Sequence, residues 1–216
     1  MTYKNLWTSE VGSSMWNMFR PGISDHDHIT VRQVSTKDLL EGRNIPKTWE
    51  QIKYTGEDGV EVDESFIEIG HLVNYLLKGN VNYLWAVTSP IVVRDNPLLA
   101  ELRKIVMENP SKLPYHSIHG MATSQKLDET KRPRLSGGKG YRTAARTALF
   151  GIHLLENWTF DYRVPESIIN LDITKEEVER YLDKLDETYE GSTLPDIPNE
   201  EPFREFLYKV RMNGIA

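Results

Sequence analysis

Two aspartates separated by one residue, Asp25 and Asp27, follow a Gly12-Ser13 pair within one short stretch of the chain. On a β-strand, side chains two positions apart point to the same face, so these two carboxylates would converge on one point. Carboxylate pairs suit Mg²⁺, which takes hard oxygen ligands and shares them with substrate phosphates. A Gly-Ser pair just before a helix offers free backbone N–H groups to phosphate oxygens. Together, the order of these residues predicts metal-assisted phosphoryl or nucleotidyl transfer.

The same stretch allows other interpretations. Asp25 and Asp27 could be solvated residues at a strand edge, and Gly12-Ser13 could be an ordinary turn. The run Asp25-His26-Asp27-His28 could also form a histidine–carboxylate metal site for hydrolysis. Side chains alternate along a strand, so His26 and His28 would point away from the two aspartates. This alternation argues against a single four-residue cage.

The elements that must position these residues are strands near the N-terminus and helices after it. Alternation predicts strands over Leu6–Val11, His26–Val34 and Val60–Ile69, with a short helix over Lys37–Glu41 capped by Thr36. From about residue 70 the apolar period becomes helical. Helices are expected over Pro97–Glu108, Ser111–Leu127, Tyr141–Glu156, Thr174–Tyr189 and Pro202–Met212, with Thr174 and Glu177 forming a capping box. The expected class is α+β: a small mixed sheet in a catalytic core over residues 1–95, and a helical region over residues 96–216 packed on that core.

Composition narrows the functional class. The 216 residues include 39% hydrophobic and 10% aromatic residues, enough for a buried core. The net charge of −6 argues against a protein that coats nucleic acid through its overall charge. The chain contains no cysteine, which excludes disulfides, thiolate zinc sites and cysteine nucleophiles. The sequence shows neither a signal peptide nor a membrane span, so a cytoplasmic protein is expected.

Beyond these local features, the pattern Gly-Ser, about ten residues, then Ser-Asp-x-Asp resembles the nucleotidyltransferases of the DNA polymerase beta superfamily. In particular it resembles the small predicted nucleotidyltransferases that include RNA-ligase-associated proteins. The resemblance extends over roughly residues 6–170 and includes three further segments: HLVNYLLKGNVNYLWAVTSPIVV (71–93), PYHSIHGMATSQ (114–125) and GKGYRTAARTALFGIHLLENW (138–158). It departs from the family pattern at Ser14, where arginine is frequent, and at Trp16-Asn17, where an aromatic-Gly pair is frequent.

The resemblance implies three catalytic carboxylates that hold two Mg²⁺ or Mn²⁺ ions. Two of them fall on Asp25 and Asp27, and the third on a later strand, where Asp63 is the choice and Glu61 and Glu68 are alternatives. The implied substrate is a nucleoside triphosphate such as ATP, bound by Gly12, Ser13 and Ser14. The implied acceptor is a hydroxyl group of RNA, a protein or a small molecule. A non-catalytic nucleotide- or RNA-binding module and a metal-dependent phosphohydrolase are the alternative functions.

A basic segment between residues 126 and 146 is a candidate for binding substrate phosphate. It holds seven basic residues against two acidic ones, although the whole chain is acidic. Arg142 and Arg146 are four apart, so they would share a helical face, and arginine suits bidentate phosphate contacts. Lys139 precedes them in the glycine-rich SGGKG loop (136–140), which lacks the order of a Walker motif. A solvated charged surface is the alternative. We predict that these three residues face the metal site and bind substrate phosphate.

Overall fold

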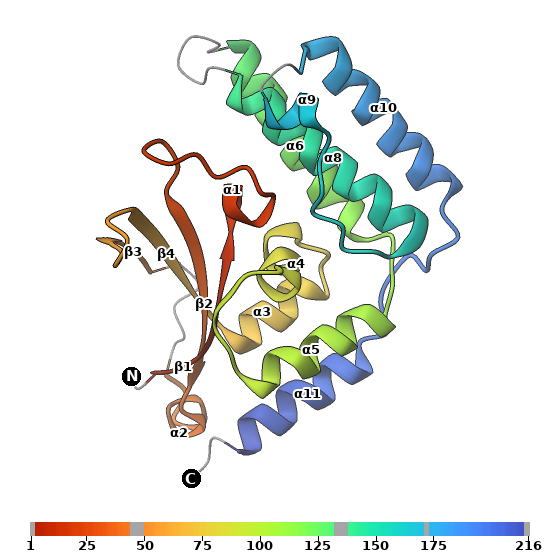
Figure 1. Ribbon diagram of the computed structural model, residues 1–216. Helices are drawn as coiled ribbons and strands as arrows, with labels where there is room; N and C mark the ends of the chain where they lie inside the picture. Colours follow the sequence, from red (N-terminus) through yellow and green to blue (C-terminus); the bar gives the residue numbers. More distant parts are fainter. Residues whose placement is uncertain (1–2, 44–49, 132–137, 171–172, 214–216) are drawn as a thin grey trace. The chain divides into compact units, whose positions relative to one another are not determined.

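A computed structural model of the chain describes residues 3–43, 50–131, 138–170 and 173–213 (Figure 1). The fold is α+β, as predicted, and it consists of two compact units. The first unit comprises residues 1–77, 82–109 and 199–216, and it contains the sheet. The second comprises residues 78–81 and 110–198, and its described elements are helical. Two helices that lie beyond residue 95, α5 (Pro97–Glu108) and α11 (Glu201–Met212), therefore belong to the same unit as the sheet.

The sheet of the first unit has five strands in the order β3-β4-β2-β1-β5. The central strands are β1 (Tyr3–Val11) and β2 (His26–Val34), which pair antiparallel, and β4 (Glu61–Glu68), which runs parallel to β2. The edge strands β3 (Gln51–Thr55) and β5 (Val92–Arg94) pair antiparallel with their neighbours. The sheet is mixed, and β2 has the bounds that alternation predicted.

One face of the sheet carries the apolar core of this unit. Trp7 and Val31 are register partners on that face, and both are completely buried. The helices α3 (Ile69–Leu76) and α4 (Val81–Thr88) contribute buried apolar side chains such as Leu72 and Ala86 (Figure 1). Burial of such side chains is the main favourable contribution to the stability of this unit.

Local signals fix the helix ends in most cases. In α5, the Asn96 side chain accepts a hydrogen bond from Leu98 N, and Pro97 occupies the first turn, where its missing N–H costs nothing. The short helix α2 (Thr36–Leu40) begins one residue earlier than predicted, because the Ser35 side chain caps it by accepting from Asp38 N. Thr36 is instead the first helical residue, and its hydroxyl donates to Arg211 O.

The second unit is built on three helices: α6 (Pro114–Lys131), α8 (Lys139–Asn157) and α10 (Lys175–Gly191), with the short α9 (Glu166–Ile169) beside α8. The predicted capping box of α10 is present, with the side chains of Thr174 and Glu177 each accepting from the other's backbone N–H. None of the described helices has the length and the apolar character that crossing a membrane requires.

Candidate active site

The turn after β1 brings Gly12 directly against the carboxylate of Asp27. Val11 at the end of β1 is the register partner of Asp27, and Gly12 opens the short helix α1 (Gly12–Met15) with a φ of 65°. A Cβ atom at position 12 would lie 1.9 Å from Asp27 Oδ2 and 2.7 Å from its Cγ. Glycine alone combines this backbone conformation with so close an approach. The two parts of the predicted site therefore meet in the fold.

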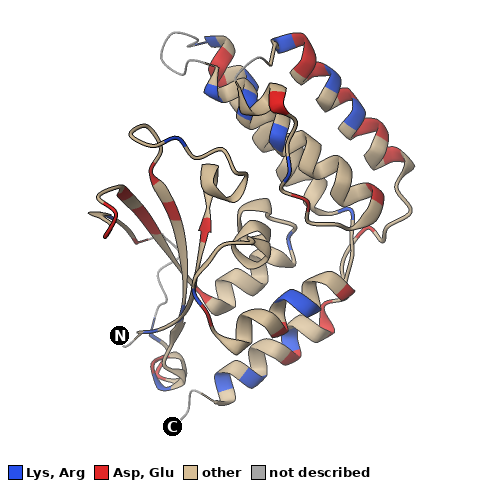
Figure 2. Cartoon of the chain, in the orientation of Figure 1, with Lys and Arg blue, Asp and Glu red and all other residues tan. Residues whose placement is uncertain are grey.

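Asp63 lies beside Asp27 on the neighbouring strand. The two residues are register partners in the parallel β2–β4 ladder. Neighbouring strands are about 4.8 Å apart and register partners point to the same face, so the two side chains extend from neighbouring positions on one face of the sheet. Gln51 Nε2 donates to Asp63 Oδ1 at 2.5 Å, and Lys53 Nζ lies 3.6 Å from Oδ2. Figure 2 shows acidic residues on the neighbouring strands β1, β2 and β4. The role of Asp63 as third carboxylate stays a prediction.

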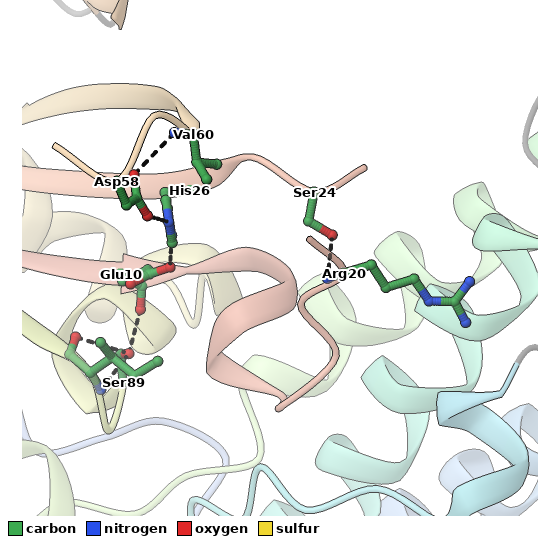
Figure 3. A network of polar contacts seen from close by, with 8 residues as sticks. Glu10, Arg20, Ser24, His26, Asp58, Val60 and Ser89 are labelled. Carbon is green, nitrogen blue, oxygen red and sulfur yellow. Dashed lines mark hydrogen bonds and ion pairs between the residues drawn. The ribbon is translucent and has the colours of Figure 1, made fainter. Parts of the chain in front are cut away.

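Asp25 lies one residue before β2, so the regular strand alternation does not extend to it. It is half-buried, and it follows a turn in which Ser24 Oγ accepts a hydrogen bond from Arg20 N at 3.0 Å (Figure 3). The turn is closed a second time by the hydrogen bond from Ser24 N to Arg20 O at 2.9 Å. The position of Asp25 is therefore set by this turn. Among the described residues, the carboxylates of Asp25, Asp27 and Asp63 do not all lie within 4.8 Å of one another, so their convergence on one metal site stays a prediction.

The two alternatives for the third carboxylate have protein partners. Glu68 is the N-cap of α3, where it accepts from Gly70 N, and its Oε1 lies 2.6 Å from Arg211 Nη2. Its side chain is only 4% exposed. Glu61 forms an ion pair of 2.9 Å with Lys53. These contacts give Glu68 a structural role at the start of α3.

The predicted phosphate-binding residues form the single turn of α1. Ser13 O accepts from Trp16 N and Met18 N, which closes the turn. Trp16 is buried and meets Trp85 of α4 edge to face at 5.7 Å, so the turn is anchored on the core. Within the described part of the chain, the buried Ser14 Oγ has no hydrogen-bond partner. A buried hydroxyl in this state is unusual in a folded protein.

On the other face of β2, the structure brings together three side chains of types that can ligate a metal, which the sequence analysis did not connect. Glu10 of β1 is the register partner of His28, and His26 lies two residues before His28 on the same face. His26 Nδ1 lies 2.5 Å from Glu10 Oε1, and its Nε2 lies 3.0 Å from Asp58 Oδ2 (Figure 3). We call Glu10, His26 and His28 the histidine cluster. The strand that supplies Glu10 could be predicted, but its register with β2 could not.

Electrostatics differ between the two histidines. The hydrogen bond with Glu10 raises the pKa of His26 against the opposing effect of burial, and Asp58 raises it further. Burial lowers the pKa of His28, which outweighs the attraction of Glu10 and Glu64. The pKa of Asp58 is lowered by the hydrogen bond from Val60 N and then by His26. His28 therefore loses its proton more readily than an ordinary histidine, and His26 less readily.

The predicted basic residues belong to the second unit. Lys139 is exposed at the start of α8. Arg142 is 7% exposed, and its Nη1 donates to Ile169 O at 3.4 Å, while Arg146 is half-buried one turn later. Arg132 and Arg134 of the same segment lie outside the described residues. The position of these basic side chains relative to Asp25 stays a prediction.

Comparison with known proteins gives only structural likenesses. No protein-family model and no curated protein sequence matches the chain. Among solved structures, a nucleotidyltransferase-like protein from Exiguobacterium sibiricum 255-15 is similar over 97% of this chain and 74% of that one, with 11% identity and a TM-score of 0.33. A TM-score this low carries no argument, so the functional proposal depends on the geometry of the site.

Proposed function

We propose that this protein is a metal-dependent nucleotidyltransferase, which transfers a nucleoside monophosphate from a nucleoside triphosphate to a hydroxyl group. One observation supports the proposal above the others. Asp27 and Asp63 are register partners on adjacent parallel strands, and Gly12 packs directly against the Asp27 carboxylate. Two carboxylates beside a glycine turn suit the binding of a metal–triphosphate complex.

The donor atoms fit the ions that this chemistry uses. Asp25, Asp27 and Asp63 offer carboxylate oxygens, which Mg²⁺ and Mn²⁺ prefer over softer ligands. When bound, two such ions would neutralise triphosphate charge and make the acceptor hydroxyl more acidic. Asp25, Asp27 and Asp63 would be the residues that hold these ions.

The residues of the chain then have separate tasks. Asp63 would take up the proton of the acceptor hydroxyl, as a general base. The oxygen freed in this way forms a bond to the α-phosphorus, while the bond from that phosphorus to the bridging oxygen of the β-phosphate breaks. Pyrophosphate leaves with the electron pair of the broken bond. Gly12 has no side chain, so its backbone can lie directly against the carboxylate of Asp27.

Positive charge from the basic segment completes the proposal. The triphosphate and the three carboxylates together carry more negative charge than two divalent ions offset, so further cationic groups are expected. Lys139 is exposed, and Lys139→Ala should raise the KM for triphosphate while the stability is retained. Arg142 is buried, so its replacement should reduce stability first. An unchanged KM in Lys139→Ala would remove this residue from the site.

The test is incubation with each of the four nucleoside triphosphates and Mg²⁺ or Mn²⁺, with RNA, peptide and small hydroxyl compounds as acceptors. We expect stoichiometric pyrophosphate and labelled acceptor from the wild type, and a loss of about 10²-fold or more in Asp27→Asn. Asp183→Asn, at an exposed position of α10, is the matched control and should keep full activity. Release of orthophosphate would favour the phosphohydrolase, and binding without turnover would favour the binding module. Equal rates in wild type and Asp27→Asn would contradict the proposed site.

A further inference from the structure

The histidine cluster lies on the face of β2 opposite to Asp27. Strand alternation places His26 and His28 on one face and Asp27 on the other. The ligand atoms of Glu10, His26 and His28 lie within 4.8 Å of one another, which holds for no other group of three or more in the described part of the chain. The cluster is therefore separate from the aspartates of the proposed active site.

The cluster is held in place by contacts on every side. The backbone of Glu10 is fixed twice, because its N donates to Ile91 O and its O accepts from Ser89 Oγ. The His26 ring stacks on Phe19, with centroids 4.9 Å apart and an angle of 13° between the planes. The side chain of Glu10 is 10% exposed, and that of His26 is 21% exposed. Such pre-positioned groups lose little conformational entropy when they bind a ligand.

We propose that Glu10, His26 and His28 bind one divalent transition-metal ion of the zinc class. Two imidazole nitrogens with one carboxylate oxygen form a donor set for zinc, cobalt or nickel rather than for magnesium or calcium. The ion would replace the proton shared between His26 Nδ1 and Glu10 Oε1, and the released proton would pass to solvent. With three protein ligands, the ion keeps an open position for water or for a substrate group.

Asp58 has the position of an orienting residue for this ion. Its Oδ2 lies 3.0 Å from His26 Nε2, the ring nitrogen that does not face Glu10. Ligating histidines commonly donate their second N–H to a carboxylate, which fixes the ring and its tautomer. The N–H of Val60 in turn donates to Asp58 Oδ1 at 3.0 Å. The network in Figure 3 therefore contains two of the proposed ligands, Glu10 and His26, together with the groups that orient them.

The site would also couple the two faces of the sheet. Its two histidines flank Asp27 on β2, so an ion bound to both would restrain the strand segment that carries Asp27. The site does not depend on the proposed nucleotidyl transfer, because it uses other side chains and another class of metal.

The test is Co²⁺ and Zn²⁺ binding to chelator-treated protein, followed by calorimetry and by the visible d–d absorption of Co²⁺. We expect one ion per chain, loss of binding in His28→Gln, and affinity about 10–100-fold lower in Asp58→Asn. His153→Gln, in α8, is the matched control and should keep the stoichiometry. Asp27→Asn should keep it too, even where it abolishes turnover, so the two proposals can fail separately.

A measurement on the wild type alone covers the case in which His28→Gln does not fold. In ¹H–¹⁵N NMR spectra of the histidine rings, Co²⁺ should shift the signals of His26 and His28 and leave that of His153 in place. Absence of a bound ion in the wild type would overturn the proposal. Equal binding in wild type and folded His28→Gln would also overturn it, as would Co²⁺-shifted signals from other histidines only.

Discussion

Replacing Gly12 with alanine tests whether the turn after β1 and the Asp27 carboxylate form one packed unit. The φ of 65° at Gly12 lies in the left-handed region, which costs an alanine about 1–2 kcal/mol. The new Cβ would also lie 1.9 Å from Asp27 Oδ2 and 2.9 Å from Asp27 Cβ. Overpacking of this kind costs about 1–3 kcal/mol more, because the carboxylate or the backbone must shift. Gly12→Ala should therefore lose about 2–5 kcal/mol of unfolding free energy.

Gly22 is the matched control for the cost of the left-handed backbone conformation. Its φ is 76°, and a Cβ there would meet nothing within 4 Å. Gly22→Ala should therefore show only the backbone cost of about 1–2 kcal/mol in urea denaturation. The double variant Gly12→Ala/Asp27→Ala should lose less than the sum of the single variants, by about 0.5–3 kcal/mol, because Oδ2 and Cγ are gone. Equal losses in Gly12→Ala and Gly22→Ala, together with additive single variants, would refute the packed unit.

Three further predictions concern the supports of the two units. Glu68→Gln should lower the unfolding free energy by about 3–5 kcal/mol, because Arg211 of α11, which is only 17% exposed, would keep its charge and lose its carboxylate partner at the start of α3. Gly140→Ala should lower the unfolding free energy by about 1–3 kcal/mol, since the new Cβ would lie 2.6 Å from the Cβ of Glu129 in α6. Tyr115→Phe should cost about 1 kcal/mol for its hydrogen bond to Asp186. Burial, and then that hydrogen bond, raise the pKa of Tyr115 to about 12. The contribution of Tyr115 to the unfolding free energy is therefore complete below the ordinary tyrosine pKa and is lost as pH rises through 12. Absorbance titration of the wild type and of Tyr115→Phe measures this pKa.

Each of the first two substitutions has a control in the chain. Glu101→Gln removes a carboxylate from an ion pair with Lys209 in which both side chains are at least 36% exposed, and it should cost less than about 1 kcal/mol. Gly120→Ala lies inside α6 with nothing within 4 Å of its new Cβ, so it should stabilise the protein by up to about 1 kcal/mol. If a control variant loses as much unfolding free energy as the variant it is matched to, the contact assigned to that variant is contradicted. For Tyr115, a titration curve that the phenylalanine leaves unchanged near pH 12 would do the same.

Elements with a strong local signal were predictable from the sequence. The helix Pro97–Glu108 has a capping asparagine before it, a proline in its first turn and an apolar stripe, and its predicted bounds are confirmed. The bounds of β2 could be predicted from the alternation of polar and apolar residues alone. This alternation reflects a strand with one face buried throughout its second half. The capping box of α10 likewise needs only residues that are close in sequence.

Elements and contacts that depend on partners distant in sequence were not predictable. The edge strand β3 is an exception: Ile52 and Tyr54 alternate with polar residues and a short turn joins the strand to β4, so the sequence held a hairpin signal that the prediction did not use. Glu10 meets His26 only because of the β1–β2 register, which the long connection between the strands does not specify. Arg142 lies on a helix that is buried around most of its circumference, so four-residue spacing alone did not indicate that its side chain is enclosed.

Placement of the active-site metal tests the central claim most directly. The measurement is an anomalous difference map from crystals grown with Mn²⁺ and a non-hydrolysable nucleoside triphosphate. We predict manganese bound to the carboxylates of Asp27 and Asp63, with the triphosphate over Gly12. Manganese and triphosphate bound elsewhere, with neither Asp27 nor Asp63 as a ligand, would contradict it.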